Sequence, residues 1–198
     1  MATIGLDGLY YSKITEGTGG AETYGTPVRL AKAIKADITI NANSEPLYAD
    51  DGISEQVDEF KDGTISLGVD DIGSAVAADL VGVTVDNNGV VISTSEDVAN
   101  YVAVGFRARK SNGKYRYFWL YRVKFSVPAV NLATKAGTIT FSTPTIEGKI
   151  MRRNKPDTRG KYPWKAEVTD GESGVSAATV SGWFSEVYEP SYASSSQH

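Results

Sequence analysis

The chain has 198 residues but no cysteine, and its single histidine is His198, the last residue. Without thiols it cannot form a disulfide framework, a cysteine-ligated metal site or a cysteine nucleophile. Because the only imidazole stands at the extreme end, Ser-His-Asp catalysis and histidine-based zinc or iron sites are excluded too. We therefore expect a fold that depends on packing alone, and a protein that is not an enzyme and holds no metal or cofactor.

Long hydrophobic runs are also missing. No window approaches the ~18 apolar residues of a membrane span, and the N-terminus has no basic region followed by an apolar run. We expect the protein to be made and kept in the cytosol. Hydrophobic residues nevertheless form 41% of the chain, which is enough to bury a core.

The net charge of only -4 conceals two opposed segments. Residues 36–106 hold fourteen acidic side chains against Lys61, a net charge of -13, whereas residues 107–165 hold fifteen basic side chains against Glu147 and Asp157, a net charge of +13. Either the two segments neutralise each other within one molecule, or they guide copies of the chain together head to tail.

The clearest local signal is the hairpin around Asn112-Gly113. Two runs rich in aromatic and β-branched residues flank this pair, which predicts a two-residue type I′ turn with Ser111 facing Lys114. That register predicts six further cross-strand pairs: Phe106–Trp119, Val104–Tyr121 and Val102–Val123 on one apolar face, and Gly105–Leu120, Arg107–Phe118 and Arg109–Arg116 on the other. Opposed arginines are unfavourable unless carboxylates meet them.

Other segments predict further strands and one flexible connection. Ile34, Ala36, Ile38 and Ile40 alternate with polar residues, which is typical of a strand with one buried face. Tight-turn residues at 86–89 predict a second hairpin, and the Gly- and Thr-rich segment 17–25 predicts a flexible connection. The remaining strands are expected at 6–14, 64–69, 137–141, 145–151 and 162–168.

Two helices are expected. Asp70 or Asp71 can cap a short helix that ends at Gly82 and plugs an end of the β core. The apolar spacing from Val180 to Tyr188 predicts an amphipathic C-terminal helix that begins at Ser173 or Ser176 and stops at Pro190.

We expect a single domain over residues 1–190, with a long acidic arm at about 42–63 and a disordered tail at 191–198. The arm carboxylates Glu55, Asp58 and Glu59 could in principle hydrolyse a glycosidic bond. Acidic residues scattered along a polar segment are normally solvated, so the arm is better explained as a chain that becomes ordered against a partner.

The segment 152–161 is basic, contains Pro156 and Gly160, and is expected to be an exposed loop. Its cations, with Tyr162 and Trp164 beside them, could grip nucleic acid through phosphate contacts and base stacking. The sequence pI of about 5.1 argues against that function for the whole protein.

The aromatic row Tyr115, Tyr117, Trp119 and Tyr121 could form a platform that stacks on sugars. Its apolar ladder partners favour burial in the core instead. A non-catalytic carbohydrate-binding β-sandwich of a phage or cell-surface protein is therefore kept as the alternative function.

Several stretches, taken in order, resemble the major tail protein family of long-tailed, non-contractile phages of Gram-positive bacteria. The resemblance covers nearly the whole chain and depends on the order of the stretches, since none of them is a catalytic motif. They are the opening 1–11, the segments 47–52 and 63–72, the hairpin 105–125, the segment 143–148 and the ending 183–188.

The resemblance implies a mainly β fold, an antiparallel sandwich or barrel-like tail-tube fold with one short helix beside the sheets. Such subunits assemble into hexameric rings that stack into a tube, through which DNA passes without specific binding. It further implies as partners a tape-measure protein, a tail terminator and a baseplate or distal tail protein. The implied locations are the virion and, during assembly, the host cytoplasm.

By this resemblance the acidic arm would reach the neighbouring ring. By the same resemblance the ends of the chain would join contacts between rings. The expected inter-subunit contacts are Glu55, Asp58, Glu59, Arg107, Arg109, Arg116, Arg152, Arg153, Trp183 and Phe184.

Overall fold

The computed structural model describes residues 2–49, 52–128 and 143–192, and the backbone alone within 44–58. The chain is mainly β and its strands pair antiparallel, which confirms the expected fold class. The elements are β1 (Thr3–Glu16), η1 (Thr18–Gly20), β2 (Glu22–Tyr24), β3 (Val28–Ala31), β4 (Ala33–Ala49), β5 (Gly52–Val69), α1 (Ser74–Val81), β6 (Thr84–Val85), β7 (Val91–Ile92), β8 (Tyr101–Lys110), β9 (Tyr115–Phe125), β10 (Thr145–Met151), β11 (Lys165–Thr169) and α2 (Ala177–Ser181).

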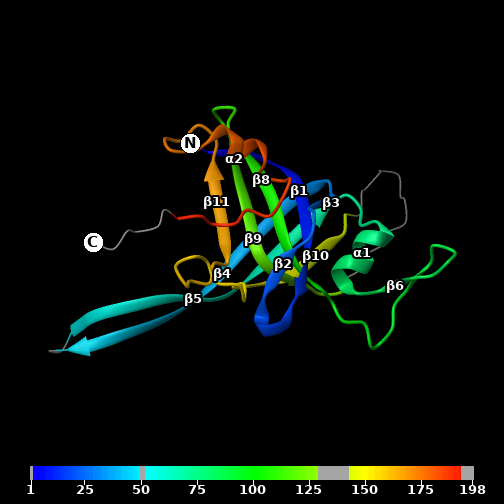
Figure 1. The fold of residues 1–198 in the computed structure, drawn as a ribbon, viewed down its shortest axis with the longest axis horizontal. Helices are drawn as coiled ribbons and strands as arrows, with labels where there is room; N and C mark the ends of the chain where they lie inside the picture. The colour runs from blue at the N-terminus through cyan, green and yellow to red at the C-terminus, as the bar shows by residue number, and fades with distance from the viewer. Residues whose placement is uncertain (1, 50–51, 129–142, 193–198) are drawn as a thin grey trace, which may run out of the picture.

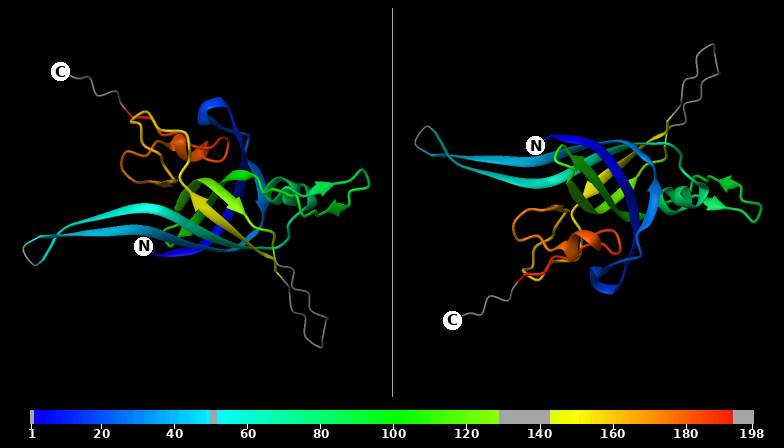
Figure 2. Two further views of the ribbon diagram at one scale, coloured as in Figure 1. Left: turned by 90° about the horizontal axis from the view of Figure 1, so that it is seen from below. Right: turned by 90° about the horizontal axis from the view of Figure 1, so that it is seen from above.

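The main sheet closes into a barrel (Figures 1 and 2). Its strand order is β2-β1-β8-β9-β10-β5-β4, and β3, which leads directly into β4, pairs back onto β1. The corner between β3 and β4 is held by Asp70, whose Oδ1 accepts a hydrogen bond from Lys32 N at 2.9 Å and whose N donates to Lys32 O at 3.1 Å. Asp70 therefore fixes the barrel corner.

The turn of the central hairpin differs from the expected one. Lys110 N donates to Lys114 O at 2.8 Å and Gly113 N donates to Lys110 O at 3.0 Å, so the loop has three residues. Gly113 has a φ of +81°, the left-handed conformation that ends such a loop. Asn112 and Gly113 suit both turn types, and the two-residue prediction was wrong.

The longer loop shifts the hairpin register by one residue. Gly105 faces Trp119, Arg109 faces Tyr115, and Phe106 stacks on Phe118 with ring centroids 4.9 Å apart. A bulge in β9 between Leu120 and Val123 then restores the expected pair Val102–Val123. The predicted opposition of Arg109 and Arg116 does not occur.

This register divides the apolar residues of the hairpin between two faces of the sheet. Those on the inner face join the barrel core, which contains Leu9, Ile65, Leu67, Val102, Val104, Phe106, Leu120, Val123, Phe125, Ile146 and Ile150. Tyr117, Trp119 and Tyr121 form a second cluster outside the barrel with Trp183 and Val187. The aromatic row is therefore largely buried, but on the opposite face from the barrel core.

Helix α1 covers one end of the barrel, as expected, because Leu80 and Val81 are buried in the barrel core. Gly82 ends the helix with a φ of +80°, which confirms that prediction. The predicted acidic cap was wrong, since Gly73 is the N-cap and no side chain caps the helix.

The C-terminal segment lies on the outer cluster (Figure 1). Ser176 caps α2 by accepting from Ala178 N, but the helix ends at Ser181 because Gly182 interrupts it. Turns follow, and they are pinned by hydrogen bonds from Trp119 Nε1 to Trp183 O (2.9 Å) and from Tyr121 OH to Tyr188 O (2.8 Å). The predicted helix to Pro190 is therefore too long.

Three other expectations have mixed outcomes. The tight turn at 86–89 joins β6 to β7 as predicted. The segment 17–25 is more ordered than expected, because η1 and β2 lie within it and β2 pairs with β1. The expected strand at 137–141 and most of the tail, 193–198, lie outside the described residues.

The contact between β8 and β9 predicts the effect of Gly105→Ala. A Cβ at this position would meet the Trp119 ring at 2.8 Å, whereas a Cβ at Gly5 would meet nothing within 4 Å. We expect Gly105→Ala to lower the free energy of unfolding by about 1–3 kcal/mol, and Gly5→Ala to change it by less than about 0.5 kcal/mol. Urea unfolding of both variants checks this, and equal effects would contradict the described packing.

Candidate assembly surfaces

The segment expected to be an acidic arm is the outer part of the β4–β5 hairpin, which projects well beyond the barrel (Figure 1). The two strands pair from Ala33–Val69 to Ala49–Gly52. β4 has 17 residues, and at ~3.3 Å per residue it extends over roughly 55 Å. Within the described part of the chain, the outer half of the hairpin, beyond Asn41, has no strand partner except itself.

The isoleucines of β4 are exposed, so the prediction that they form a buried face was wrong. Ile34 is 54% exposed, Ile38 37% and Ile40 39%. β4 pairs with β5 on one side, and no described strand pairs with its other edge. The alternation identified the strand correctly, but none of the described elements fully covers these three isoleucines.

Ile38 and Ile40 belong to the inner face of the barrel wall. Ile38 faces the buried Ile65 in register, and the Cδ1 atoms of Ile40 and Ile150 both approach Gly63. β4 and the start of β1 diverge from the corner at β3 (Figure 1), and no ladder of hydrogen bonds joins these two strands in the described part of the chain. A cavity of about 360 Å³ beside these strands is lined by Thr3, Leu6, Ala36, Phe106, Phe118 and Arg116. We call this cavity, with Ile38 and Ile40, the barrel mouth.

Of the three candidate arginines on the hairpin, two have carboxylate partners in the same molecule. Arg107 Nη2 donates to Asp7 Oδ2 at 2.6 Å, and these hydrogen bonds hold the pKa of the Asp7 carboxyl below its usual value. Arg116 pairs with Glu167 of β11. Arg109 is exposed on β8, opposite Gly5 and Tyr115.

The two neighbouring arginines of the basic loop have opposite environments. Arg152 is exposed and its guanidinium lies 4.8 Å from the centre of the Tyr162 ring. Arg153 is 1% exposed, packs over Tyr121 and donates from Nη1 to Glu189 Oε2 at 2.9 Å. The expectation that the whole loop is exposed is therefore wrong at Arg153, which anchors the loop to the C-terminal segment.

The other candidate contact residues also differ in their exposure to solvent. Trp183 is buried in the outer cluster, so it is not accessible to a neighbouring subunit. Phe184 is half-buried and stacks on Tyr10 with centroids 4.5 Å apart. Glu59 is exposed at the base of the arm, whereas the side chains of Glu55 and Asp58 lie outside the described residues.

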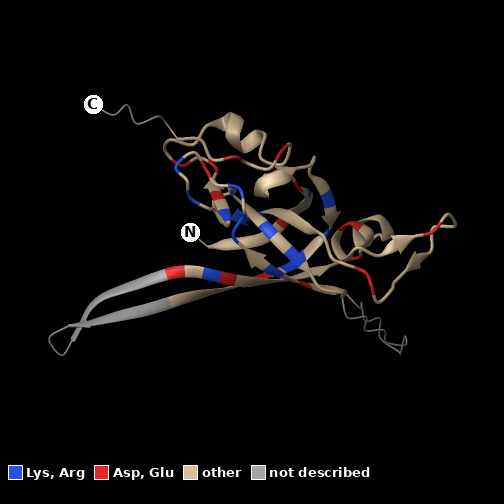
Figure 3. Cartoon of the chain, turned by 60° about the horizontal axis from the view of Figure 1, so that its bottom comes forward, with Lys and Arg blue, Asp and Glu red and all other residues tan. Residues whose placement is uncertain are grey.

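The ion pairs show whether the acidic and basic segments neutralise each other. Figure 3 shows where the described charged residues lie along the chain. Only one pair in the described part of the chain, Lys149–Asp62, joins the acidic segment 36–106 to the basic segment 107–165. Apart from Arg159–Asp157 within the segment itself, the other paired cations of 107–165 meet carboxylates from outside both segments: Asp7, Glu16, Glu22, Glu167, Asp170 and Glu189. Neutralisation of the two segments by each other is not what the described residues show.

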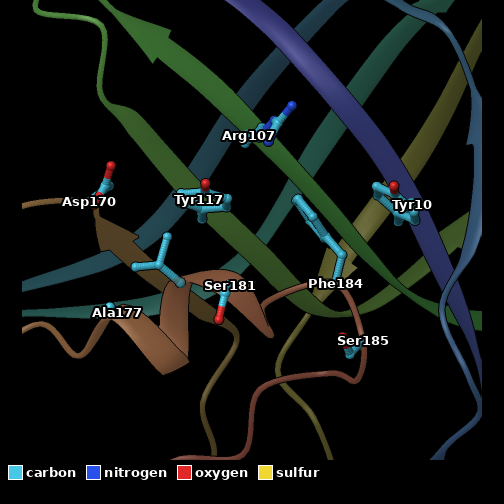
Figure 4. Close-up of a pocket in the computed structure, with 9 residues that line it drawn as sticks. Tyr10, Arg107, Tyr117, Asp170, Ala177, Ser181, Phe184 and Ser185 are labelled. Carbon is cyan, nitrogen blue, oxygen red and sulfur yellow. The ribbon is translucent and has the colours of Figure 1, made fainter.

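A second cavity, of about 410 Å³, lies between β1, β9 and α2 (Figure 4). Tyr10, Tyr117 and Phe184 supply aromatic walls, while Arg107 and Asp170 supply charge. In the described ranges no three acidic or imidazole side chains gather where they could hold a metal ion. Neither described helix is long and apolar enough to cross a membrane.

Comparison with known proteins adds no relative: no protein-family model matches the chain, and no curated protein matches it.

The contrast between the two arginines gives a direct test of the loop. Arg153→Glu places a second carboxylate beside Glu189 at a buried position, and we expect it to cost more than about 3 kcal/mol of unfolding free energy. Arg152→Glu at the exposed neighbour should change stability by less than about 0.5 kcal/mol. Chemical denaturation measures both, and a tolerated Arg153→Glu would contradict the anchoring role.

Proposed function

We propose that the protein is a structural subunit that assembles with its own copies into stacked hexameric rings, forming the tail tube of a long-tailed, non-contractile phage. The observation that carries the proposal is the edge of β4 that no described strand pairs. β4 displays three exposed isoleucines and continues into an arm that projects from the barrel.

A long edge strand with exposed apolar side chains is a template for pairing with another chain, and monomeric proteins normally protect such edges. Lys35 and Asp37 are the charged residues near the start of the β4 edge, and they pair with each other at 2.5 Å. Complete burial of an isoleucine side chain contributes about 1.5–3 kcal/mol. Apolar contact along β4 therefore supplies affinity for a second copy.

Charge sets the orientation in which two copies meet. The arm is acidic by sequence and projects from the barrel (Figure 1), whereas the basic residues of β8 and β9 belong to the barrel itself, so a copy meets the next one through unlike surfaces. Such a heterologous contact closes into a ring in one direction and propagates in the other. Exposed ion pairs add only ~0.2–1 kcal/mol each, so they set orientation more than affinity.

The other parts of the proposal follow from the family resemblance. The tube would form around a tape-measure protein, end at a tail terminator and meet a baseplate or distal tail protein. DNA would pass through the lumen without specific binding, because a negatively charged wall repels phosphates. In this function the chain is not an enzyme and acts in the virion.

Assembly gives the central prediction. Negative-stain microscopy of the concentrated protein should show rings or hollow tubes. Ile38→Lys combined with Ile40→Lys should abolish them, because charges on the inner face of the edge strand would have to be buried at the contact.

The matched control is Val91→Lys with Ile92→Lys on β7, where the side chains are 40% and 45% exposed. This control should assemble normally. A wild-type protein that stays monomeric at high concentration, even with its tape-measure partner, would count against the tube.

A second candidate function is carbohydrate binding. The original reason for it is weakened, because Tyr117, Trp119 and Tyr121 are buried. The aromatic cavity of Figure 4 is the observation that still favours it, since aromatic walls with a few polar groups suit a small polar ligand.

Glycan titration separates the two functions. A tube subunit should give no saturable change in tryptophan fluorescence across a glycan panel. A saturable change that Phe184→Ala removes, without loss of fold by circular dichroism, would favour the carbohydrate-binding function.

A further inference from the structure

The cavity of the barrel mouth has the size and composition of a site for a small amphipathic molecule. Its volume of about 360 Å³ lies within the roughly 300–1,000 Å³ of ligand pockets, which are mostly apolar with a few polar groups. We propose that it binds the anion of a medium-chain fatty acid, with the alkyl chain inside and the carboxylate on Arg116. This inference goes beyond the proposed function and does not depend on it.

The hollow arises because small residues stand between larger ones. On three adjacent strands, Ala108 of β8 faces Leu6 of β1 on one side and Arg116 of β9 on the other. A single methyl group does not fill the space between two long side chains. Gly5 also lines the cavity, and a Cβ there would meet nothing within 4 Å. The strand register therefore leaves a hollow at this end of the sheet.

The deep part of the cavity is apolar. Phe106 is 4% exposed and stacks on Phe118 with ring centroids 4.9 Å apart. Leu6 and Ala36 line the cavity and pack against the barrel core. An alkyl chain placed here would leave water and contact apolar side chains, so each buried methylene group would strengthen binding.

The polar groups of the cavity lie at its rim. Thr3 is exposed and Arg116 is half-buried, whereas Phe106 is buried. Among the described residues that line the cavity, Arg116 carries the one charge. A molecule with an apolar chain and an anionic head matches this change from a buried apolar floor to a positive rim.

Arg116 has hydrogen-bonding capacity for that head. Its Nη2 donates to Glu167, and its guanidinium lies 5.3 Å from the centre of the Phe118 ring. A guanidinium carries five N–H donors in a planar fork that suits carboxylates. Lys165 Nζ also pairs with Glu167, at 2.7 Å, so two cations share one carboxylate. The group therefore keeps a net positive charge, which attracts an anion.

A chain-length series tests the apolar part of the site. Isothermal titration calorimetry with hexanoate, octanoate and decanoate should show one site per chain, in protein dilute enough that light scattering detects no assemblies. Affinity should rise roughly fourfold per added methylene group from hexanoate to octanoate. An affinity that does not change with chain length would overturn the proposal.

A charge variant tests the head group. Arg116→Gln should weaken octanoate binding about tenfold, because hydrogen bonds to the carboxylate lose their charge assistance, and should leave octanol binding unchanged. The matched control is Arg109→Gln at an exposed position of β8, which should bind octanoate like the wild type. Equal losses of octanoate and octanol binding would contradict the role of Arg116.

A filled cavity tests the location. Gly5→Leu should weaken octanoate binding by about tenfold or more, because its side chain would displace at least two methylene groups of the ligand. The control is Gly73→Leu before α1, where a Cβ also meets nothing within 4 Å. It should bind octanoate normally, and circular dichroism of both variants checks that they are folded.

The outcomes separate this inference from the tube. No saturable binding of octanoate or decanoate, or binding that Gly5→Leu leaves intact in a folded protein, would overturn the fatty-acid site. The lining of the cavity does not include Ile38 or Ile40, on which the assembly test depends. Rings and tubes from a protein that binds no octanoate would therefore leave the proposed function standing.

Discussion

The barrel closes at β3, and the rest of the molecule depends on this constraint. β3 pairs with β1 and ends at Ala31, after which the corner at Lys32 and Asp70 turns the chain into β4. β4 then continues beyond the closure with β5 as its only described partner. This short pairing thus closes one side of the core and leaves an apolar edge of β4 that no described strand pairs. The proposed contact with a second copy therefore uses an edge created by the same topology that closes the core.

The two faces of β9 pack against different parts of the molecule. Its inner face completes the barrel core, while Tyr117, Trp119 and Tyr121 on the outer face bind the C-terminal segment through packing and two side-chain hydrogen bonds. Arg153 fastens the basic loop to the same segment through Glu189. The aromatic and basic residues that could have formed a ligand platform instead form a second internal layer. In the proposed assembly, the β4 edge and the arm are the surfaces that meet other copies.

Charge in this protein is arranged for more than internal neutrality. The cations of the barrel strands that have partners use carboxylates from the N- and C-terminal parts of the chain, and Lys149–Asp62 is the single described pair with the acidic segment. Apart from Asp62, the described carboxylates of the acidic segment form no ion pair with the basic segment. Because exposed charges act mainly on encounter and orientation, this arrangement would affect the proposed assembly more than the stability of one molecule.

Sequence alone determined the mainly β class, most strands, helix α1 with its glycine stop, and the opposed charge segments, because periodicity and glycine positions are local properties. It did not determine the register at Asn112-Gly113, since those residues suit both two- and three-residue loops and the choice belongs to the paired strands. Nor could it separate Arg152 from Arg153, or show that Ile38 and Ile40 are exposed. Burial depends on what covers a face, and only the tertiary structure decided that the isoleucines of β4 are left exposed by the elements it describes.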